Sequence, residues 1–304
     1  MNEIATLDIS SSLKRIGSQT DVLGECPLWD DVLKCLYWVD IRRPAIRRWS
    51  LESGEIDTWS MPGLVGSIAL VDDGRLLVAL PDQIALFSPA TGDIHSLVAN
   101  FSMPEGHRFN DGRCDSSGRF WVGSMHNITR APEGALFCLE GKGPLRKMLS
   151  GVCIPNSLAF SPTGDTLYFA DSLHYQIHAY TYTQATGTMG AAKLFAESAP
   201  PAFPDGSAVD ADGFVWNAEF NGGRLLRYAP DGRIDRIVTL PVDRPTCCAF
   251  GGADLDILFI TSTSQNLSDS ERALQPMAGA LMAFRPGVQG LPEPRFSLTG
   301  PRAS

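Results

Sequence analysis

Six times along the chain, a short apolar segment, a polar turn and a second apolar segment follow one another. Three of these copies read "ECPLWDDVLKCLYWVD", "NDGRCDSSGRFWVGS" and "DGSAVDADGFVWNAE". The second apolar segments begin at Leu36, Leu76, Phe120, Leu167, Val215 and Leu258, which gives intervals of 40, 44, 47, 48 and 43 residues. Short apolar runs bounded by turn residues are typical of β-strands, so each copy predicts a pair of strands.

A third element follows each copy. It alternates apolar and polar residues, reaches a turn that contains glycine, and then continues, as in "IALFSPATGDI" and "LLRYAPDGRID". This pattern indicates a β-hairpin, so each unit holds about four short strands. Helical periodicity is scarce and is limited to one short turn near residues 266–275.

A repeat of about 40–50 residues with four strands in each unit is typical of a β-propeller. The sequence therefore predicts an all-β fold, a six-bladed β-propeller with four-stranded antiparallel blades. No linker or shift in composition divides the chain, so we expect one domain over residues 1–304. Its blades should lie roughly within residues 20–295, between short N- and C-terminal tails. A stacked pair of β-sandwiches is the alternative, but it does not explain six near-equal intervals.

Each unit opens on one lead residue, and the six are Glu25, Gly66, Asn110, Asn156, Asp205 and Thr246. If the first strand of each blade is the innermost one, these residues meet at one end of the central channel. Two carboxylates that face each other in a narrow channel repel, and burying them is costly unless a cation compensates. Carboxylate and amide oxygens suit Ca²⁺, Mg²⁺ or Mn²⁺, and carboxylates also accept Zn²⁺. The ring predicts one divalent metal ion; polar plugs bonded to strand ends and water are the alternative.

Further polar residues lie beside this ring. Arg108 precedes Asn110 by two residues, so both side chains can face one space, and the planar guanidinium suits carboxylate or polyol oxygens. His126 ends the strand-like run "FWVGSMH", and Glu219 ends "VWNAE". Both are weaker candidates for the wall of a substrate pocket. For Arg108 and His126, an ordinary surface position is the alternative.

Composition limits the classes of partner and the compartment. The formal net charge is −9, whereas a protein that binds nucleic acid needs a basic surface. No apolar run approaches the roughly 18 residues of a membrane helix, and the N-terminus lacks the pattern of a signal peptide. The seven cysteines include no Cys-x-x-Cys pair. We therefore expect a cytoplasmic protein with free thiols, bound neither to nucleic acid nor to membrane, and the vicinal Cys247–Cys248 is interpreted as strand packing.

Five segments of the chain carry a family resemblance: "LGECPLWDD", "RFNDGRCDSSGRFWVGSM", "IPNSLAFSPTGDTLYFADS", "FPDGSAVDADGFVW" and "RPTCCAFGG". Together they resemble the senescence-marker-protein/gluconolactonase/regucalcin family. The resemblance covers nearly the whole chain, from about residue 22 to about residue 285. It implies a six-bladed propeller with one divalent metal ion in the channel and, as in many members, hydrolysis of sugar lactones.

The resemblance also implies roles for particular residues. Glu25, Asn156 and Asp205 match the metal ligands of the family. Arg108 and Asn110 match residues that hold the substrate, and Asp205 also matches the proposed general base. The chain departs from the family at Cys26, where many members have glycine, at His126, near a glutamate of some animal members, and around Glu219. These departures leave the identity of the sugar open.

The resulting hypothesis is a metal-dependent aldonolactonase, a carboxylic ester hydrolase that opens a sugar lactone to the aldonic acid. A divalent cation would polarise the lactone carbonyl, while Asp205 either accepts a proton from the attacking water or serves only as a ligand. The polar "NAEF" segment favours a pentonolactone, such as that of arabinose or xylose. A calcium-binding regulatory propeller and a hydrolase of other esters are the alternatives. The Arg108–Asn110 pair favours the lactonase, because a metal buffer needs no donors that orient a sugar. The sequence leaves the oligomeric state open.

Overall fold

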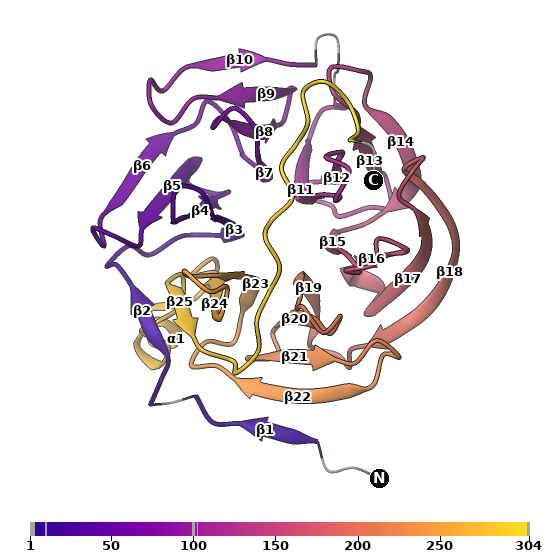
Figure 1. The fold of residues 1–304 in the computed structure, drawn as a ribbon. Helices are drawn as coiled ribbons and strands as arrows, with labels where there is room; N and C mark the ends of the chain where they lie inside the picture. The colour runs from indigo at the N-terminus through magenta and orange to yellow at the C-terminus, as the bar shows by residue number, and fades with distance from the viewer. Residues whose placement is uncertain (1–3, 10, 99–100, 102, 303–304) are drawn as a thin grey trace.

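Six antiparallel sheets surround a central channel in the computed structural model, which describes residues 4–9, 11–98, 101 and 103–302 (Figure 1). This confirms the predicted six-bladed β-propeller. Blade one contains β3 (Gly24–Asp30), β4 (Cys35–Asp40), β5 (Ala45–Ser50) and β6 (Ile56–Ser60). Blade two contains β7 (Ser67–Leu70), β8 (Leu76–Leu80), β9 (Gln83–Phe87) and β10 (Ile94–Ser96). Blade three contains β11 (His107–Cys114), β12 (Phe120–His126), β13 (Gly134–Leu139) and β14 (Arg146–Val152). The strands run outward from the channel in chain order, so each repeat folds as one blade.

The remaining blades repeat this order. Blade four contains β15 (Pro155–Phe160), β16 (Thr166–Asp171), β17 (Gln176–Thr183) and β18 (Thr188–Glu197). Blade five contains β19 (Phe203–Val209), β20 (Val215–Phe220), β21 (Arg224–Tyr228) and β22 (Ile234–Thr239). Blade six contains β23 (Pro245–Gly251), β24 (Ile257–Ser262) and β25 (Leu281–Phe284). A 3₁₀ turn, η1 (Ser172–His174), follows β16. The helix α1 (Asp269–Leu274) confirms the predicted short turn and carries a capping box between Ser268 and Glu271.

The core lies between the blades, where neighbouring sheets cover each other. Every residue of β4 and β8 is buried, and both strands carry apolar side chains on both of their faces. Such strands have no solvent face, because a blade on either side removes both faces from water. The outermost strands β6 and β10 are largely exposed.

The N-terminal segment belongs to the blades, and this corrects the expectation that they begin near residue 20. The strand β2 (Lys14–Ile16) pairs with β25 and completes the sixth blade as its fourth strand. The strand β1 (Ala5–Leu7) adds to β22 as a parallel fifth strand of blade five. Strands this short carry too little pattern to be recognised in the sequence. A strand from near the start of the chain, β2, therefore pairs with β25 from near its end, and this pairing closes the ring of blades.

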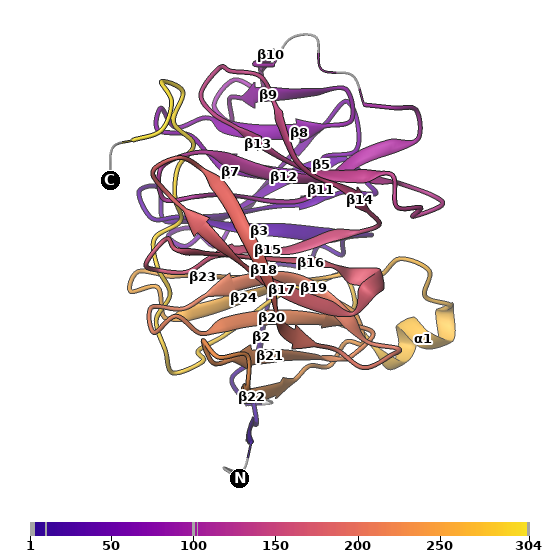
Figure 2. The same cartoon turned by 90° about the vertical axis from the view of Figure 1, so that its right-hand side faces the viewer.

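The C-terminal segment is also more than a tail. Residues 285–302, here called the C-terminal strap, cross the face of the propeller over the channel (Figure 1). Phe296 donates its backbone N–H to Leu70 O at 2.7 Å, and Arg295 Nη2 lies 2.7 Å from Asp30 Oδ1. Because both contacts involve the far ends of the innermost strands, the strap closes the end of the channel opposite the lead residues. Figure 2 shows the strap and α1 on opposite faces.

No helix among the described residues is long and apolar enough to cross a membrane. The single-domain interpretation stays a prediction.

Candidate metal and substrate site

The register of the innermost strands shifts where the lead residues lie. Shifts occur between Glu25 and Leu28 in β3 and between Asn156 and Ala159 in β15. The strands β11, β19 and β23 shift in the same way next to their lead residues. A β-bulge bends its strand and redirects side chains, and such bulges are frequent next to binding sites. The repeated bulge therefore turns polar side chains into one end of the channel.

Cys26 shows what the first of these bulges requires. Its φ of 49° lies in the left-handed region, which glycine adopts without steric cost. The family resemblance implies a glycine at this position, and a glycine would adopt this φ without strain. In this chain the thiol packs against Ser67 Oγ at 3.3 Å, and burial raises the pKa of Cys26 to about 12. The cysteine is therefore a packing residue next to Glu25.

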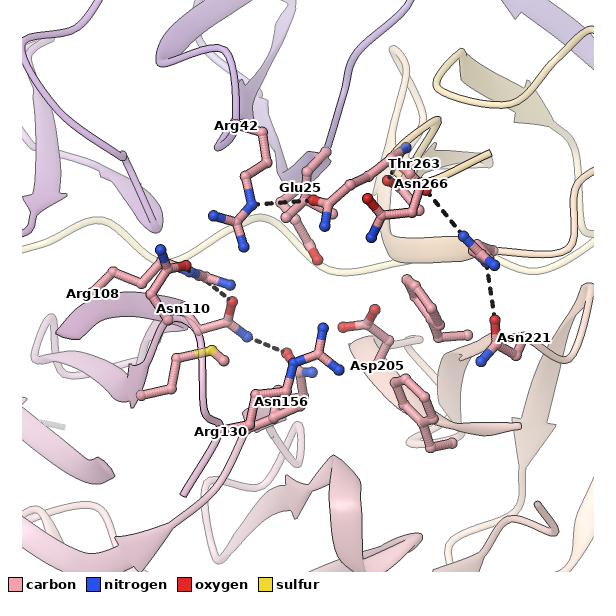
Figure 3. Close-up of a pocket in the computed structure, with 18 residues that line it drawn as sticks. Glu25, Arg42, Arg108, Asn110, Arg130, Asn156, Asp205, Asn221, Thr263 and Asn266 are labelled. Carbon is pink, nitrogen blue, oxygen red and sulfur yellow. Dashed lines mark hydrogen bonds between the residues drawn. The ribbon is translucent and has the colours of Figure 1, made fainter. Parts of the chain in front are cut away.

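A cavity of about 260 Å³ opens at this end of the channel (Figure 3). Five predicted site residues line it, namely Glu25, Arg108, Asn110, Asn156 and Asp205. The other two lead residues, Gly66 and Thr246, do not. Thr246 instead donates its hydroxyl to Gly24 O and ties blade six to blade one. The sequence thus predicted the core of the cavity, to which the four inner strands β3, β11, β15 and β19 contribute.

A chain of hydrogen bonds fixes the polar side chains on the floor of the cavity. Arg108 Nη1 donates to Asn110 Oδ1 at 2.6 Å, and Asn110 Nδ2 donates to Asn156 Oδ1 at 2.8 Å. Asn156 Nδ2 in turn donates to Ser172 Oγ at 2.8 Å, and this hydroxyl donates to Pro204 O at 2.7 Å. Because the Asn156 amide nitrogen donates to Ser172, the amide oxygen lies on the side of Asn110.

The two carboxylates of the floor lie in an unfavourable environment for negative charge. Burial and the nearby Asp111 raise the pKa of Glu25 to about 8. Burial, Glu25 and Asp111 hold the pKa of Asp205 well above its usual range. A bound dication would relieve both the repulsion and the loss of hydration. The donor set of Glu25, Asp205 and the Asn156 amide oxygen therefore fits a hard divalent metal ion.

This set differs from the sites that soft metals favour. Among the described residues, no group of three or more His, Cys, Asp or Glu side chains is placed to hold a metal ion. All seven cysteines are buried free thiols. Burial raises the pKa of Cys247 well above its usual value, which agrees with the packing role expected for the vicinal pair.

An apolar wall completes the cavity beside Asp205. The rings of Phe203 and Phe220 stack with centroids 4.9 Å apart and planes at 15°, and both line the cavity. Met125 and Ile154 also line it. Apolar faces and convergent polar groups in one cavity are typical of small-molecule sites. A sugar ring offers both C–H faces and hydroxyls, so its chemistry matches this lining.

His126 and Glu219 are not among the residues that line the cavity. His126 Nδ1 lies 3.1 Å from the backbone nitrogen of Thr129, which places it in its own loop. Glu219 is buried and forms an ion pair with Arg224. Their contact with substrate stays a prediction, and the lining of the cavity does not support it.

Sequence reasoning singled out none of several further residues at the mouth of the cavity, although the connection at residues 264–276 was expected to shape it. Besides Arg108, three arginines line it: Arg42, Arg130 and Arg244. Asn127, Asn221, Gln265 and Asn266 join them. All of these lie in connections that follow or precede strands, where the repeat pattern is weakest. Their distances from the nearest strand end differ, so the repeat carries no signal that could have indicated them.

Comparison with known proteins agrees with this geometry. The sequence model described as SMP-30/Gluconolactonase/LRE-like region matches residues 23–264. The chain is 36% identical over 292 residues to 6-deoxy-6-sulfogluconolactonase of Pseudomonas putida, covering 95% of this chain and 100% of that protein. It is 35% identical over 285 residues to L-arabinolactonase of Azospirillum brasilense, covering 92% of this chain and 93% of that protein.

A solved structure matches equally well along its length. The crystal structure of regucalcin from Agrobacterium tumefaciens, described as a calcium-binding protein, superimposes with a TM-score of 0.90. The two chains are 28% identical, and the match covers 97% of this chain and 99% of that one. Fold, cavity and sequence agree, and the chain belongs to the SMP-30/gluconolactonase/LRE-like family.

Proposed function

We propose that this protein is a lactonase that hydrolyses a sugar lactone to the corresponding aldonic acid with the help of one divalent metal ion. One observation carries the proposal: two mutually repelling carboxylates, an oriented amide oxygen and a buried arginine line the same small cavity. The relatives named gluconolactonase and arabinolactonase support the substrate class. Lactones are cyclic carboxylic esters, so the reaction is ester hydrolysis.

In this proposal, Glu25, Asn156 and Asp205 hold the metal ion. A divalent cation in that place would supply Lewis-acid chemistry to the lactone carbonyl. The three oxygen donors are compatible with Ca²⁺, Mg²⁺, Mn²⁺ and Zn²⁺. Ser172 holds the amide nitrogen of Asn156 by a hydrogen bond, which would leave the amide oxygen for Asn110 and the metal ion.

The protein's own residues then bind and orient the sugar. Arg108 is held by Asn127 Oδ1 at 3.0 Å and by Asn110 Oδ1, so its guanidinium is fixed before substrate arrives. A fixed donor places the lactone carbonyl relative to the attacking water, and such positioning contributes strongly to rate. Asp205 accepts a proton from that water when its carboxylate is not fully committed to the cation.

Calcium binding without catalysis is the second candidate function, and the resemblance to a protein described as calcium-binding favours it. A metal buffer would need the carboxylates and Asn156. It would need neither the buried Arg108 nor the stacked Phe203 and Phe220. These residues give the cavity a shape and a donor pattern for an organic ligand, which is why we place the lactonase first.

Two variants separate the metal site from the substrate site. Replacement of Asp205→Ala should abolish lactone hydrolysis and weaken metal binding by more than about 100-fold in calorimetric titration, because a charged ligand is lost. Replacement of Arg108→Ala should keep metal binding but lower kcat/KM about 100-fold. Arg43→Ala is the control, since Arg43 is exposed and does not line the cavity.

Because Arg108 is buried, its variants are first checked for an unchanged thermal unfolding midpoint. Arg108→Lys serves as the second variant, which keeps the charge but lacks the planar fork of donors. It should recover only part of the lost kcat/KM. Unchanged kcat/KM in both Arg108 variants would contradict the proposed substrate site, and metal-independent turnover would contradict the proposed metal.

A further inference from the structure

Four arginines line the cavity: Arg42, Arg108, Arg130 and Arg244. None of them forms an ion pair with a carboxylate among the described residues. Most of the other arginines of the chain do, including the buried pairs Arg47–Asp21 and Arg227–Asp210. In a chain with a net charge of −9, acidic partners are plentiful, so this cluster of unpaired arginines requires an explanation.

Neutral oxygens, and not carboxylates, orient these guanidinium groups. Three amide side chains accept the Nε–H bonds: Gln265 Oε1 from Arg42 at 3.1 Å, Asn127 Oδ1 from Arg108 at 3.0 Å and Asn221 Oδ1 from Arg244 at 3.1 Å. An amide oxygen fixes the direction of an arginine without cancelling its charge. The cavity wall is therefore ordered and remains positively charged.

The arginines also repel one another. Burial lowers the pKa of Arg42 from its usual value, and Arg130 lowers it further. Burial lowers the pKa of Arg108 to about 10, with further contributions from Arg42 and Arg130 that the nearby carboxylates oppose. Three like charges close enough to affect each other destabilise the free protein. A ligand that carries negative charge would remove this cost on binding.

The carboxylates on the floor of the cavity do not neutralise these arginines once a metal ion is bound. Glu25 and Asp205 together carry two negative charges, which one dication neutralises. Four guanidinium groups then remain. A neutral lactone offers only hydroxyls and a carbonyl, and these need hydrogen-bond donors but no positive field.

Arg42 and Arg130 are the best placed for a charged substituent. They belong to the connections after β4 and β12, and Figure 3 shows both side chains extending over the cavity from different blades. Arg130 is exposed, and its guanidinium has no hydrogen bond within the described part of the chain. Arg108 lies deeper and is committed to Asn110, while Arg244 Nη1 is held by Gln265 O at 3.0 Å.

We propose that the preferred substrate is a sugar lactone with an anionic group (sulfonate, phosphate or carboxylate) at the end of its carbon chain, held by Arg42 and Arg130. This inference rests on the proposed lactonase function and specifies its substrate class. The lactone ring then lies over Glu25, Asn156 and Asp205, and the anionic end points towards the mouth of the cavity. Arg42 and Arg130 are specificity residues in this arrangement.

The test compares lactones that differ only at the terminal carbon. The uncharged probe is glucono-δ-lactone, and the charged probes carry a sulfonate, a phosphate or a carboxylate at carbon six. For the parent protein, kcat/KM should be at least about 100-fold higher for one charged probe, chiefly through a lower KM, and the three charged probes identify the anion. In Arg42→Gln and Arg130→Gln, the ratio of kcat/KM for that probe over the uncharged lactone should fall about 10- to 100-fold.

The matched control is Arg43→Gln, which neutralises the exposed neighbour of Arg42 and should leave the ratio unchanged. Equal kcat/KM for charged and uncharged lactones in the parent protein would overturn the inference while supporting the proposed function. A parallel loss on both lactones in the Arg42 and Arg130 variants would overturn it as well.

Absence of turnover with every lactone would overturn the proposed function, and the anion site is then tested by binding. Calorimetric titration with gluconate and with the gluconates that carry the anion at carbon six separates the effect of that group. Tighter binding of a charged form, lost in Arg42→Gln, would support the anion site. Equal affinities would overturn it.

Discussion

The side chain of Asn156 illustrates how a single residue is prepared for a ligand. An asparagine offers an oxygen on one side and donor hydrogens on the other, so a metal site needs the correct orientation. Here the nitrogen donates to Ser172 Oγ, and the oxygen accepts from Asn110. Ser172 does not line the cavity, yet it determines which atom of Asn156 does.

Replacement of Ser172→Ala therefore tests a positioning role at the residue scale. Without the hydroxyl acceptor the amide of Asn156 loses its fixed orientation, and we expect metal affinity to fall about 10- to 100-fold. Calorimetric titration with Ca²⁺ measures the change. Ser124→Ala is a matched control, because Ser124 is also buried, its hydroxyl accepts a backbone N–H from Ala135, and it does not line the cavity. Equal metal affinity in the two variants would contradict the role assigned to Ser172.

At this scale the sequence predicted the residues that occupy repeated positions. Glu25, Asn110, Asn156 and Asp205 could be found because each opens a unit of the repeat, and the repeat also fixes where they meet. Arg42 and Arg130 could not, because they lie in connections of different length that no repeat relates. Their shared cavity is a consequence of tertiary structure.

The C-terminal strap is the element whose role the sequence concealed most completely. It has little regular secondary structure, so neither hydrophobic periodicity nor turn signals mark it. Its contacts are made by single residues with the ends of inner strands in several blades. One of them, Glu293, reaches Arg113 in the channel, with Nη1 and Oε2 3.0 Å apart and both side chains largely buried. The strap therefore holds the end of the channel that lies opposite the cavity.

Arg295 supplies a testable anchor for this element. Its Nη2 bonds to Asp30 Oδ1 at 2.7 Å and to Asp31 Oδ1 at 2.9 Å. Although burial raises the pKa of Asp30, the hydrogen bonds from Arg295 and from backbone amides lower it overall. Replacement of Arg295→Gln should reduce the free energy of unfolding at pH 7 by about 1 to 3 kcal/mol, measured by chemical denaturation.

The pH dependence of that loss has a definite sign. A carboxyl group whose pKa is lowered on folding stabilises the folded state at pH values above its unfolded pKa, near 3.8 for Asp30. This contribution disappears as the pH falls through the folded pKa, so the difference between parent and variant should shrink below about pH 4. Arg302→Gln is the control, because the exposed Arg302–Asp72 pair of the same strap should contribute less than about 1 kcal/mol. A difference that does not change between pH 7 and pH 3 would contradict the assignment.

On the scale of the whole molecule, six similar blades surround a channel whose two ends differ. The bulged starts of the inner strands form the cavity, and the strap covers their other ends (Figure 2). The sequence predicted the number of blades and the order of strands, because both follow from the period of the repeat. It did not predict that β2 completes the sixth blade or that the strap crosses the channel, because each depends on contacts between distant parts of the chain.

This arrangement brings the three proposed metal ligands, Glu25, Asn156 and Asp205, from three blades into one cavity, so the central claim concerns the molecule as a whole. We would treat the protein with a chelator and then supply Ca²⁺, Mg²⁺, Mn²⁺ or Zn²⁺ in turn. Ring opening of a panel of aldonolactones would be followed by proton release, with the spontaneous reaction subtracted. The account predicts that turnover is lost on removal of the metal and restored by at least one of these ions. Metal binding without turnover of any lactone would contradict it and would favour the calcium-binding function.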